Sequence, residues 1–295
     1  MKSIKDLSID DFKITTQVSI NDLPTDFPLE ATEKEIKKEL KQTRKALGEL
    51  QNTLYAHGKY GVLVCFQAMD TAGKDSLIRE VFKDFNVRGV VNYSFKTPSS
   101  KELKHDYLWR HYEALPERGK YAVFNRTHYE NVLVTRVHPS YLMNENNPFL
   151  KSPEEADEEF WNMRFTQINN FEKHIHQNGV IIFKFFLNIT KEEQKYRLLR
   201  RLEKKDKNWK FSPGDLKERK LWDQYMQCYE DIFNKTSLPH APWYNIPAND
   251  KATARLIVAK ILLETMKSYT DIVEPELPKE LQAQIPVYKS ELENE

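Results

Sequence analysis

Several residue types are scarce in this chain of 295 residues, and each scarcity excludes a class of protein. The two cysteines, Cys65 and Cys228, lie far apart and match no metal-binding or redox spacing, which excludes a disulfide framework and a cysteine-ligated metal. No run of 18 apolar residues occurs, and the first residues, MKSIKDLSIDDF, lack the apolar region of a signal peptide. We therefore expect a soluble cytoplasmic protein that does not enter a membrane.

The net charge is also small. Lys and Arg total 45 and Asp and Glu total 44, which leaves +1 with His neutral. A balance this even gives no general attraction to nucleic acid, so we expect no nucleic-acid partner. Any site for a polyanion must then be a local cluster of basic residues. The chain is 40% hydrophobic and 12% aromatic, enough to bury a sizeable core.

Hydrophobic periodicity predicts an alternation of strands and helices. The predicted strands are residues 62–66, 89–95, 121–125, 179–189 and 243–248. The predicted helices are residues 32–57, 74–85, 100–113, 154–177, 191–210, 213–234 and 250–267. This alternation is typical of an α/β protein whose parallel sheet is covered on both faces. We predict one domain over residues 33–268, with an irregular N-terminal arm (1–32) and an irregular C-terminal tail (269–295).

The helix predicted at residues 32–57 carries an apolar stripe close to heptad spacing. Its members are Ile36, Leu40, Leu47, Leu50 and Leu54. The stripe favours a helix that lies on the core of its own domain, and a partner helix from another subunit is the alternative.

The segment Phe66–Glu80, FQAMDTAGKDSLIRE, has the context of a phosphate-binding loop but departs from its usual pattern, G-x-x-x-x-G-K-[ST]. A buried strand precedes it and a helix follows, and Gly73 and Lys74 match the pattern. Ala68 stands where the first glycine is expected. Asp75 replaces the hydroxyl residue that normally binds Mg²⁺, and Asp70 lies inside the loop. Either carboxylate can supply the missing oxygen ligand, because hard cations prefer oxygen.

A second candidate segment, Tyr121–Pro139, begins with an apolar strand and then turns polar at Asn125 and Arg126. Ligands of α/β proteins bind beyond the carboxyl ends of parallel strands, so this position points to a site. Glu130 and Arg136 follow in the same segment. An ordinary strand end with helix-capping residues is the alternative interpretation.

A basic helix is predicted at residues 191–210, with nine basic and four acidic residues. Arg197, Arg200, Arg201 and Lys204 recur at helical spacing and share one face. Guanidinium groups bind phosphate in pairs of hydrogen bonds, so the face suits a lid over transferring phosphates, and we place this lid at residues 191–220. A solvated charged face is the alternative.

Taken together, these motifs resemble the family-2 polyphosphate kinases, a branch of the P-loop kinases with a thymidylate-kinase-like fold. The resemblance spans about residues 33–265. It rests on FQAMDTAGKDSLI, SFKTPSSKELKHDYLWRHYEALPERGKYAVFNRTHYENVLVTRVHP, RFTQINNFEKHI and KNWKFSPGDLKER. It implies a three-layer α/β/α core, a mobile helical lid and a homo-oligomer, either a dimer or a tetramer. The loop AGKD (72–75) and the segments FNR (124–126) and THYENVLVTRVHP (127–139) are most similar to the subgroup that accepts both nucleoside mono- and diphosphates.

The resemblance also implies an activity and a set of site residues. The activity is reversible, Mg²⁺-dependent phosphoryl transfer between inorganic polyphosphate and nucleotides (AMP and ADP, with GMP and GDP), with Mn²⁺ as an alternative metal. Many members have aspartate where this chain has Asn125, so the metal ligands here are Asp70 and, more weakly, Asn125. The predicted catalytic residues are Asp70, Lys74, Arg126 and Arg136. The predicted nucleotide- and polyphosphate-binding residues are Met69, Thr71, Ala72, Gly73, Asp75, Asn125, Glu130, Arg197, Arg200, Arg201, Lys204 and Lys210.

Two other functions fit parts of the sequence. An ATP-dependent nucleotide kinase of the thymidylate-kinase type shares the loop and the fold, but the long basic face favours a longer polyanion than a triphosphate. An inactive P-loop module that binds nucleotide or polyphosphate fits the irregular loop. For the nucleobase, Trp109, Tyr112 and Trp209 are candidate stacking partners, and the role of Asp75 is left open.

Overall fold

The computed structural model describes residues 2–15 and 17–295. Within these residues the strands form one six-stranded sheet in the order β1-β6-β5-β2-β4-β3. The strands are β1 (Lys13–Ile14), β2 (Gly61–Gln67), β3 (Val90–Ser94), β4 (Tyr121–Asn125), β5 (Val180–Asn188) and β6 (Trp243–Pro247). Strands β6 to β3 pair in parallel, and β1 runs antiparallel to β6. The predicted α/β class with a mostly parallel sheet is confirmed.

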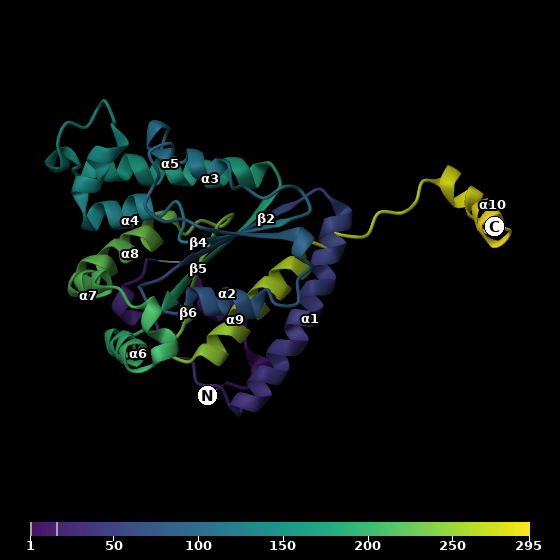
Figure 1. Ribbon diagram of the computed structural model, residues 1–295, viewed down its shortest axis with the longest axis horizontal. Coiled ribbons are helices and arrows are strands. Elements are labelled where there is room, and N and C mark those ends of the chain that lie inside the picture. Colours follow the sequence, from purple (N-terminus) through teal and green to yellow (C-terminus); the bar gives the residue numbers. More distant parts are fainter. Residues whose placement is uncertain (1, 16) are drawn as a thin grey trace.

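Helices cover both faces of the sheet (Figure 1). They are α1 (Glu33–His57), α2 (Lys74–Val81), α3 (Trp109–Tyr112), α4 (Glu130–Val137), α5 (Glu158–Gln177), α6 (Lys191–Glu203), α7 (Pro213–Lys220), α8 (Trp222–Thr236), α9 (Lys251–Ser268) and α10 (Lys279–Glu293). Helices α1, α2 and α9 lie on one side of the sheet, and α3 and α5 lie on the other.

The central strand β2 shows why the sheet needs cover on both sides. All seven of its residues are buried. Val62, Val64 and Phe66 point into the apolar cluster that includes residues of α1 and α9. Leu63 and Cys65 point into a second cluster with residues of α5. Successive side chains of a strand face opposite sides, so a strand that is apolar throughout must be buried on both.

Helix α1 begins and ends at strong local signals. Thr32 and Glu35 form a reciprocal capping box at its start, and Gly58 ends it with a left-handed φ of 66°. Ile36, Leu40, Leu47 and Leu54 of the predicted stripe are buried, Leu50 is partly buried, and α1 packs along α9 of the same chain. The interpretation of α1 as a core helix is therefore confirmed, and the partner-helix alternative is wrong.

Several of the predicted elements differ from the structure. The helix predicted at residues 191–210 ends at Glu203, and Lys205–Lys210 form a separate 3₁₀ helix. Residues 100–113 form only a 3₁₀ turn (Glu102–Lys104) and the short α3. The helix predicted at residues 213–234 is broken at Leu221, whose φ of −94° and ψ of 13° separate α7 from α8. The C-terminal tail, predicted to be irregular, contains α10.

The N-terminal arm is also more ordered than predicted. It contains three 3₁₀ helices (Ile4–Asp6, Ile9–Phe12 and Ile20–Asp22) and the edge strand β1. Phe12, Ile14, Ile20 and Leu29 are buried in the main core cluster. The arm therefore stabilises the sheet by burying apolar side chains beside β6.

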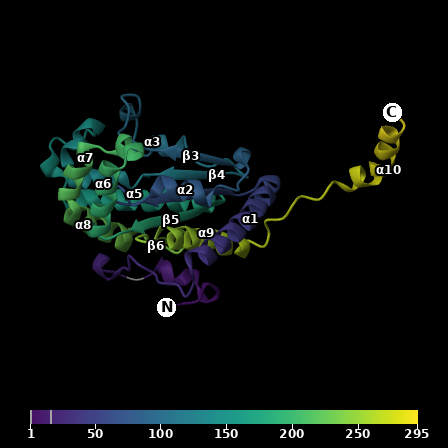
Figure 2. The same ribbon diagram turned by 60° about the horizontal axis from the view of Figure 1, so that its bottom comes forward.

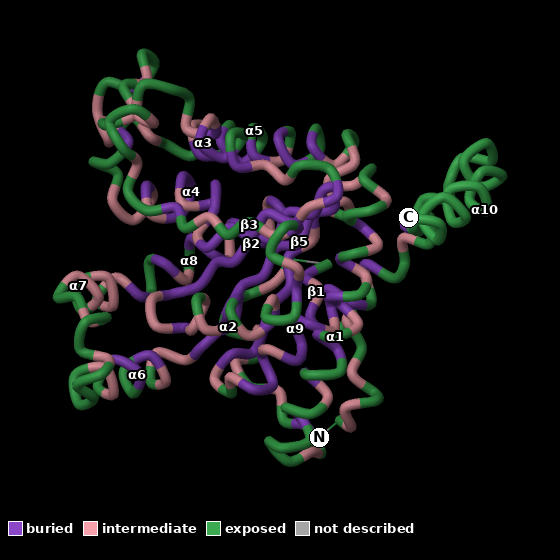
Figure 3. The backbone as a smooth tube through the Cα atoms, turned by 45° about the vertical axis from the view of Figure 1, so that its right-hand side comes forward, coloured by how far each residue is buried: buried purple, intermediate pink, exposed green. Residues whose placement is uncertain are grey.

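Helix α10 projects away from the rest of the molecule (Figures 1 and 2). No residue of α10 is buried, whereas strands β2, β4, β5 and β6 and the inner faces of α1 and α9 are (Figure 3). No helix of the described residues has the length and apolar composition needed to cross a membrane.

Candidate active site

The candidate site lies where two neighbouring strands end. Strands β2 and β4 are adjacent and parallel, and Phe66 pairs in register with Asn125. The loop after β2 (residues 68–73) and the turn after β4 (residues 126–129) therefore leave the same edge of the sheet. This is the edge at which ligands bind in open α/β folds. The two segments singled out in the sequence meet there, as predicted.

The loop after β2 has the backbone shape of an anion-binding turn. Thr71 and Gly73 have left-handed φ values of 67° and 106°. Gly73 precedes α2 without a side-chain cap, so the first backbone N–H groups of α2 are free to bind a ligand. Because few side chains tolerate a φ of 106°, glycine at position 73 is required by the backbone. Met69 and Ala72 are buried in the core cluster and anchor the loop.

Lys74 is the first residue of α2, and its side chain turns back toward the loop. Its Nζ donates a hydrogen bond of 2.7 Å to the carbonyl oxygen of Ala68. Burial lowers the pKa of the Lys74 ammonium, and the carboxylate of Asp70 acts in the opposite direction. The ammonium is thus held against the loop, where the negative charge of a bound phosphate favours its protonated form.

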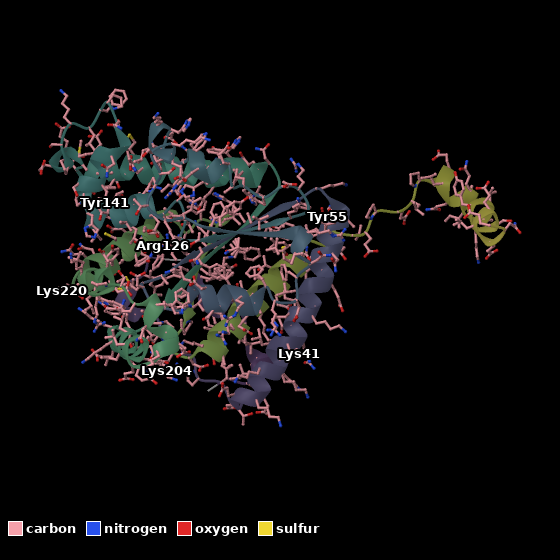
Figure 4. The ribbon with its side chains drawn as sticks, viewed as in Figure 1. Lys41, Tyr55, Arg126, Tyr141, Lys204 and Lys220 are labelled. Carbon is pink, nitrogen blue, oxygen red and sulfur yellow. The ribbon has the colours of Figure 1, made fainter. Side chains whose placement is uncertain are left out.

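Arg126 faces Asp70 across the site. One guanidinium nitrogen of Arg126 lies 3.3 Å from Oδ1 of Asp70. Burial acts to lower the pKa of Arg126, but the carboxylates of Glu130 and Asp70 outweigh it and raise that pKa. The backbone of Arg126 has a φ of 63°, a strained value for a residue with a side chain. Figure 4 shows Arg126 near the middle of the molecule.

Asp75 has a partner that the sequence did not reveal. Nδ2 of Asn125 donates a hydrogen bond of 2.7 Å to Oδ1 of Asp75. This contact directs the amide nitrogen of Asn125 toward α2 and leaves its oxygen free. Asp75 therefore orients Asn125. The aspartate that replaces the usual hydroxyl residue of the loop thus holds the asparagine that stands where many members of the resembled family have aspartate.

A cavity of about 690 Å³ opens above these residues. Its charged lining, counted over the described residues, comprises ten lysine and arginine side chains and two carboxylates. The cations are Lys74, Arg79, Lys96, Arg126, Arg197, Arg200, Arg201, Lys207, Lys210 and Lys251, and the carboxylates are Asp70 and Asp75. Thr71, Gly73 and Asn125 also line the cavity. So strong an excess of positive charge in a concave site suits a polyanion.

A second cavity of about 280 Å³ adjoins the first, and Lys96, Thr97 and Arg126 line both. Its walls are more apolar and include Phe95, Leu103, Pro98, Tyr107 and Val134. Glu130 lies on its wall, as does Arg110, whose guanidinium stacks 5.3 Å from the centre of the Phe95 ring. Carboxylates of Glu102, Asp106 and Glu145 line it too, so the pocket combines apolar walls with groups that can hydrogen-bond a nucleobase.

Comparison with known proteins identifies the family. The family model described as "Polyphosphate kinase 2 (PPK2)" matches residues 30–273. The chain belongs to the polyphosphate kinase 2 family. The predicted family is thus confirmed, and with it the activity of a polyphosphate:nucleotide phosphotransferase.

Individual relatives agree with this assignment. The chain is 50% identical to an ADP-polyphosphate phosphotransferase of Rhodopseudomonas palustris, over 75% of this chain and 76% of that protein. It is 43% identical to an AMP/ADP-polyphosphate phosphotransferase of Meiothermus ruber, over 75% of this chain and 77% of that protein. The crystal structure of polyphosphate kinase 2 from Arthrobacter aurescens aligns with a TM-score of 0.88 at 32% identity, covering 98% of this chain and all of that one.

Within this polyphosphate kinase, Arg197 lines the cationic cavity, but its guanidinium is hydrogen-bonded within the chain. Its Nε donates to Glu193, and its two terminal nitrogens donate to the carbonyl oxygens of residues 71, 72, 248 and 249 at 2.7–3.3 Å. These contacts use all five N–H groups of the guanidinium. Arg197 therefore fastens the phosphate loop to the turn before α9, and no donor is left for polyphosphate.

Four predicted residues lie outside both cavities of the described chain: Met69 and Ala72, which are buried in the core, and Arg136 and Lys204. Arg136 pairs with Asp231 at 2.7 Å and lies over the rings of Trp161 and Phe165. Arg136 lies six residues after Glu130 on α4, and its contacts are with α5 and α8 instead of the cavities. Lys204 is exposed at the end of α6 and does not line the cationic cavity (Figure 4).

The kinase site also contains residues that the sequence analysis missed. Lys96 follows β3, Lys207 lies in the 3₁₀ helix Lys205–Lys210, and Lys251 begins α9. Lys96 and Lys251 lie next to predicted strand ends, and Lys207 lies within the predicted lid. These positions were the signal that could have identified them as site residues. The proposed stacking residues Trp109, Tyr112 and Trp209 line neither cavity. Trp109 instead stacks on His105, with ring centres 4.0 Å apart.

This family generally uses a divalent metal, and the site fits one. Among the described residues, no three His, Cys, Asp or Glu side chains gather to hold a metal. Mg²⁺ characteristically takes one or two carboxylates and completes its shell with water and substrate phosphates. The Asp70 carboxylate and the free oxygen of Asn125, both on the cavity wall, suit that mode.

Proposed function

We propose that this enzyme transfers the terminal phosphoryl group of inorganic polyphosphate to both nucleoside monophosphates and diphosphates. AMP and ADP are the main acceptors, GMP and GDP are accepted as well, and the reaction is reversible. The observation that carries the proposal is the cationic cavity and its junction, at Arg126, with the smaller apolar pocket. One cavity suits a long polyanion, and the other suits a nucleoside.

In this proposal the phosphoryl group is transferred beside the wall that the two cavities share. A nucleobase in the apolar pocket directs its phosphates past Arg126 toward Lys74 and the amides at the start of α2. Polyphosphate in the cationic cavity places its terminal phosphate against the same groups. The acceptor oxygen and the terminal phosphorus are then held in line, which removes much of the entropic barrier to transfer.

The transfer needs little proton chemistry. An oxygen of the nucleotide's last phosphate forms a bond to the terminal phosphorus, the bridging P–O bond breaks, and the shortened polyphosphate keeps the bridging oxygen. The nucleotide phosphate is already ionised, so no strong general base is needed. Lys74 and the loop amides bind the phosphoryl oxygens, and Arg126 offsets the charge that develops between the two substrates.

A divalent cation is part of the proposal. We assign Asp70 as its main protein ligand and the oxygen of Asn125 as a weaker one. Mg²⁺, or Mn²⁺ in its place, supplies charge neutralisation to the phosphates when bound. Asp75 holds Asn125 in the orientation that keeps this oxygen turned to the site.

The names of the relatives support acceptance of both nucleotide classes, since one is named for ADP and another for AMP and ADP. The test supplies polyphosphate with AMP, ADP, GMP or GDP in separate reactions and resolves every product by chromatography. We expect ADP and ATP from AMP, and ATP from ADP, with the guanine nucleotides following the same pattern. Turnover of diphosphates alone would overturn the assignment to the mixed subgroup. The proposal also includes a homo-oligomer, a dimer or a tetramer.

A further inference from the structure

Helix α10 has an apolar face with nothing against it. Leu281, Ile285, Tyr288 and Leu292 recur at steps of four, three and four residues, so they form one seam along the helix. Each is between 43% and 70% exposed. Such a seam is the pattern of a helix that packs against another helix.

An isolated α10 is not expected to be stable. It has only 15 residues and contains Pro286, and isolated helices of this length are marginal in water even without proline. The Arthrobacter structure aligns with 98% of this chain. Residues 279–295 are a larger share of the chain than the part left unaligned, so at least part of this tail aligns with a solved relative. We take both facts to mean that a contact with another molecule holds the helix.

The body of the molecule carries a matching helix face on the lid. Tyr196, Leu199 and Leu202 share one side of α6 and are 59%, 47% and 48% exposed. The charges of the two segments are opposite. Residues 191–210 carry nine basic and four acidic residues, whereas residues 274–295 carry two lysines and six glutamates. Apolar contact and long-range attraction therefore favour the same pairing.

The tail is tied down too far from its own lid to make this contact within one chain. Asp271 accepts a hydrogen bond from Tyr60, the ring of His57 bonds the carbonyl of Val273, and Ile272 is buried. Only residues 274–278 remain as a free linker, which spans at most about 18 Å. Helix α9, about 27 Å long, lies between this anchored segment and Lys251 at the cavity, so the linker alone cannot bring the start of α10 to α6. In Figure 1 the tail leaves on the side opposite α6.

We propose that α10 of one chain docks, through its Leu281–Leu292 seam, on the exposed α6 face of a second copy of this chain. The seam covers Tyr196, Leu199 and Leu202 of the lid, and the acidic tail lies beside the basic lid segment. Each copy then holds the lid of another, so assembly and lid position are coupled.

The first experiment measures mass in solution by light scattering after gel filtration. The full chain has a mass of 35.0 kDa, and removing residues 274–295 should lower the number of chains in each particle, counted with the mass of the shortened chain. Leu281→Glu with Tyr288→Glu should do the same. Ala283→Glu with Ser290→Glu adds the same charge to the opposite face of α10 and should leave the mass unchanged. If the truncated protein forms particles with as many chains as the full-length protein, the proposal is overturned.

The second experiment identifies the receiving face. A chain with Ile285→Cys is mixed with a chain carrying Leu199→Cys, and the mixture is oxidised. Cys65 and Cys228 are buried and give little background. A disulfide-linked pair of unlike chains, mapped by mass spectrometry, is expected, and Ala283→Cys in place of Ile285→Cys should give none.

The other outcomes of this cross-linking are equally informative. Linkage of Ile285→Cys chains only to one another would mean that tails pair with tails, and it overturns the proposal. So does a disulfide within one chain when both substitutions are made together at low protein concentration. These readouts are mass and covalent linkage, so they do not depend on the proposed acceptor specificity.

Discussion

At the scale of single residues, Arg197 and Arg200 lie on the same face of α6 but have different hydrogen-bond partners. Both lie on the basic side of α6, as their spacing predicted, and both line the cationic cavity. The guanidinium of Arg197 is fully used by backbone carbonyls and Glu193. No hydrogen bond within the described chain occupies the side chain of Arg200. Spacing alone could not separate the two, because the difference depends on carbonyl groups from distant loops.

We therefore expect different losses from the two substitutions. Arg197→Ala should destabilise the protein by about 3 kcal/mol, because it leaves buried carbonyls and Glu193 without a partner. It should also lower kcat, through a loosened loop. Arg200→Ala should raise KM for polyphosphate while KM for the nucleotide and the unfolding midpoint stay near wild type. Steady-state kinetics and guanidinium unfolding measure both, and an Arg197→Ala protein of normal stability would refute the assigned role.

Lys251 gives the site a pH dependence. Burial, with the nearby positive charges of Arg197 and Arg200, lowers the pKa of Lys251 to about 8. The free enzyme therefore loses this charge as pH rises through about 8. Bound polyphosphate favours the charged form, so binding should raise this pKa and take up a proton near pH 8.

We expect KM for polyphosphate to rise between about pH 7 and pH 9, because Lys251 loses its positive charge over this range. Lys251→Met cannot titrate, so its KM should be higher at pH 7 and should not show this rise. Calorimetry in buffers of different ionisation enthalpy should show proton uptake on polyphosphate binding by the wild type only. An identical pH profile for both proteins would contradict the assignment.

At the scale of elements, a buried ionic network joins β5, α5 and the segment before α4. Nζ of Lys184 donates to Glu172 at 2.7 Å, to the Tyr129 hydroxyl at 2.8 Å and to the carbonyl of Thr236 at 2.8 Å. His128 also contacts the Glu172 carboxylate, at 3.0 Å. Lys184 and Glu172 are fully buried, so each depends on the other for its charge. The network fixes residues 128 and 129, which follow Arg126 and its strained turn.

Lys184→Met should cost about 3–5 kcal/mol of unfolding free energy, because it leaves the Glu172 carboxylate buried without its cation. Adding Glu172→Gln removes that charge and should recover part of the loss. Lys267→Met breaks only an exposed pair with Glu264 and should change stability by less than about 1 kcal/mol. Guanidinium unfolding compares the three, and a double variant less stable than Lys184→Met would contradict this account.

The elements themselves differ in how far the sequence predicts them. Strands β2 to β6 and helices α1, α5 and α9 follow from long apolar patterns and clear caps. The break at Leu221 has no proline or glycine in the sequence to indicate it. Helix α10 was missed because Pro275, Pro278 and Pro286 suggested an irregular tail, although its apolar seam was present in the sequence.

At the scale of the whole molecule, the site is an assembly of charges from distant segments. Lys74, Arg126 and the lid arginines were recognisable from local motifs. Lys96, Lys207 and Lys251 join them only because the sheet order brings the ends of β3 and β6 to the edge where β2 and β4 end. Arg136 was grouped with Arg126 because both lie in the same short segment, but α4 places its side chain beside Asp231, outside both cavities. The division into arm, domain and tail stays a prediction.

The central claim is that polyphosphate in the cationic cavity is the phosphoryl donor. The most direct measurement incubates the enzyme with ADP, Mg²⁺ and polyphosphate, without any other nucleotide, and follows ATP and polyphosphate length by ³¹P NMR. We predict that ATP forms as terminal phosphates are lost, that omitting polyphosphate abolishes it, and that Lys74→Ala lowers the rate at least about 100-fold. Lys41→Ala, on the exposed side of α1, should match wild type. Phosphorylation of nucleotides that requires ATP and ignores polyphosphate would contradict the account.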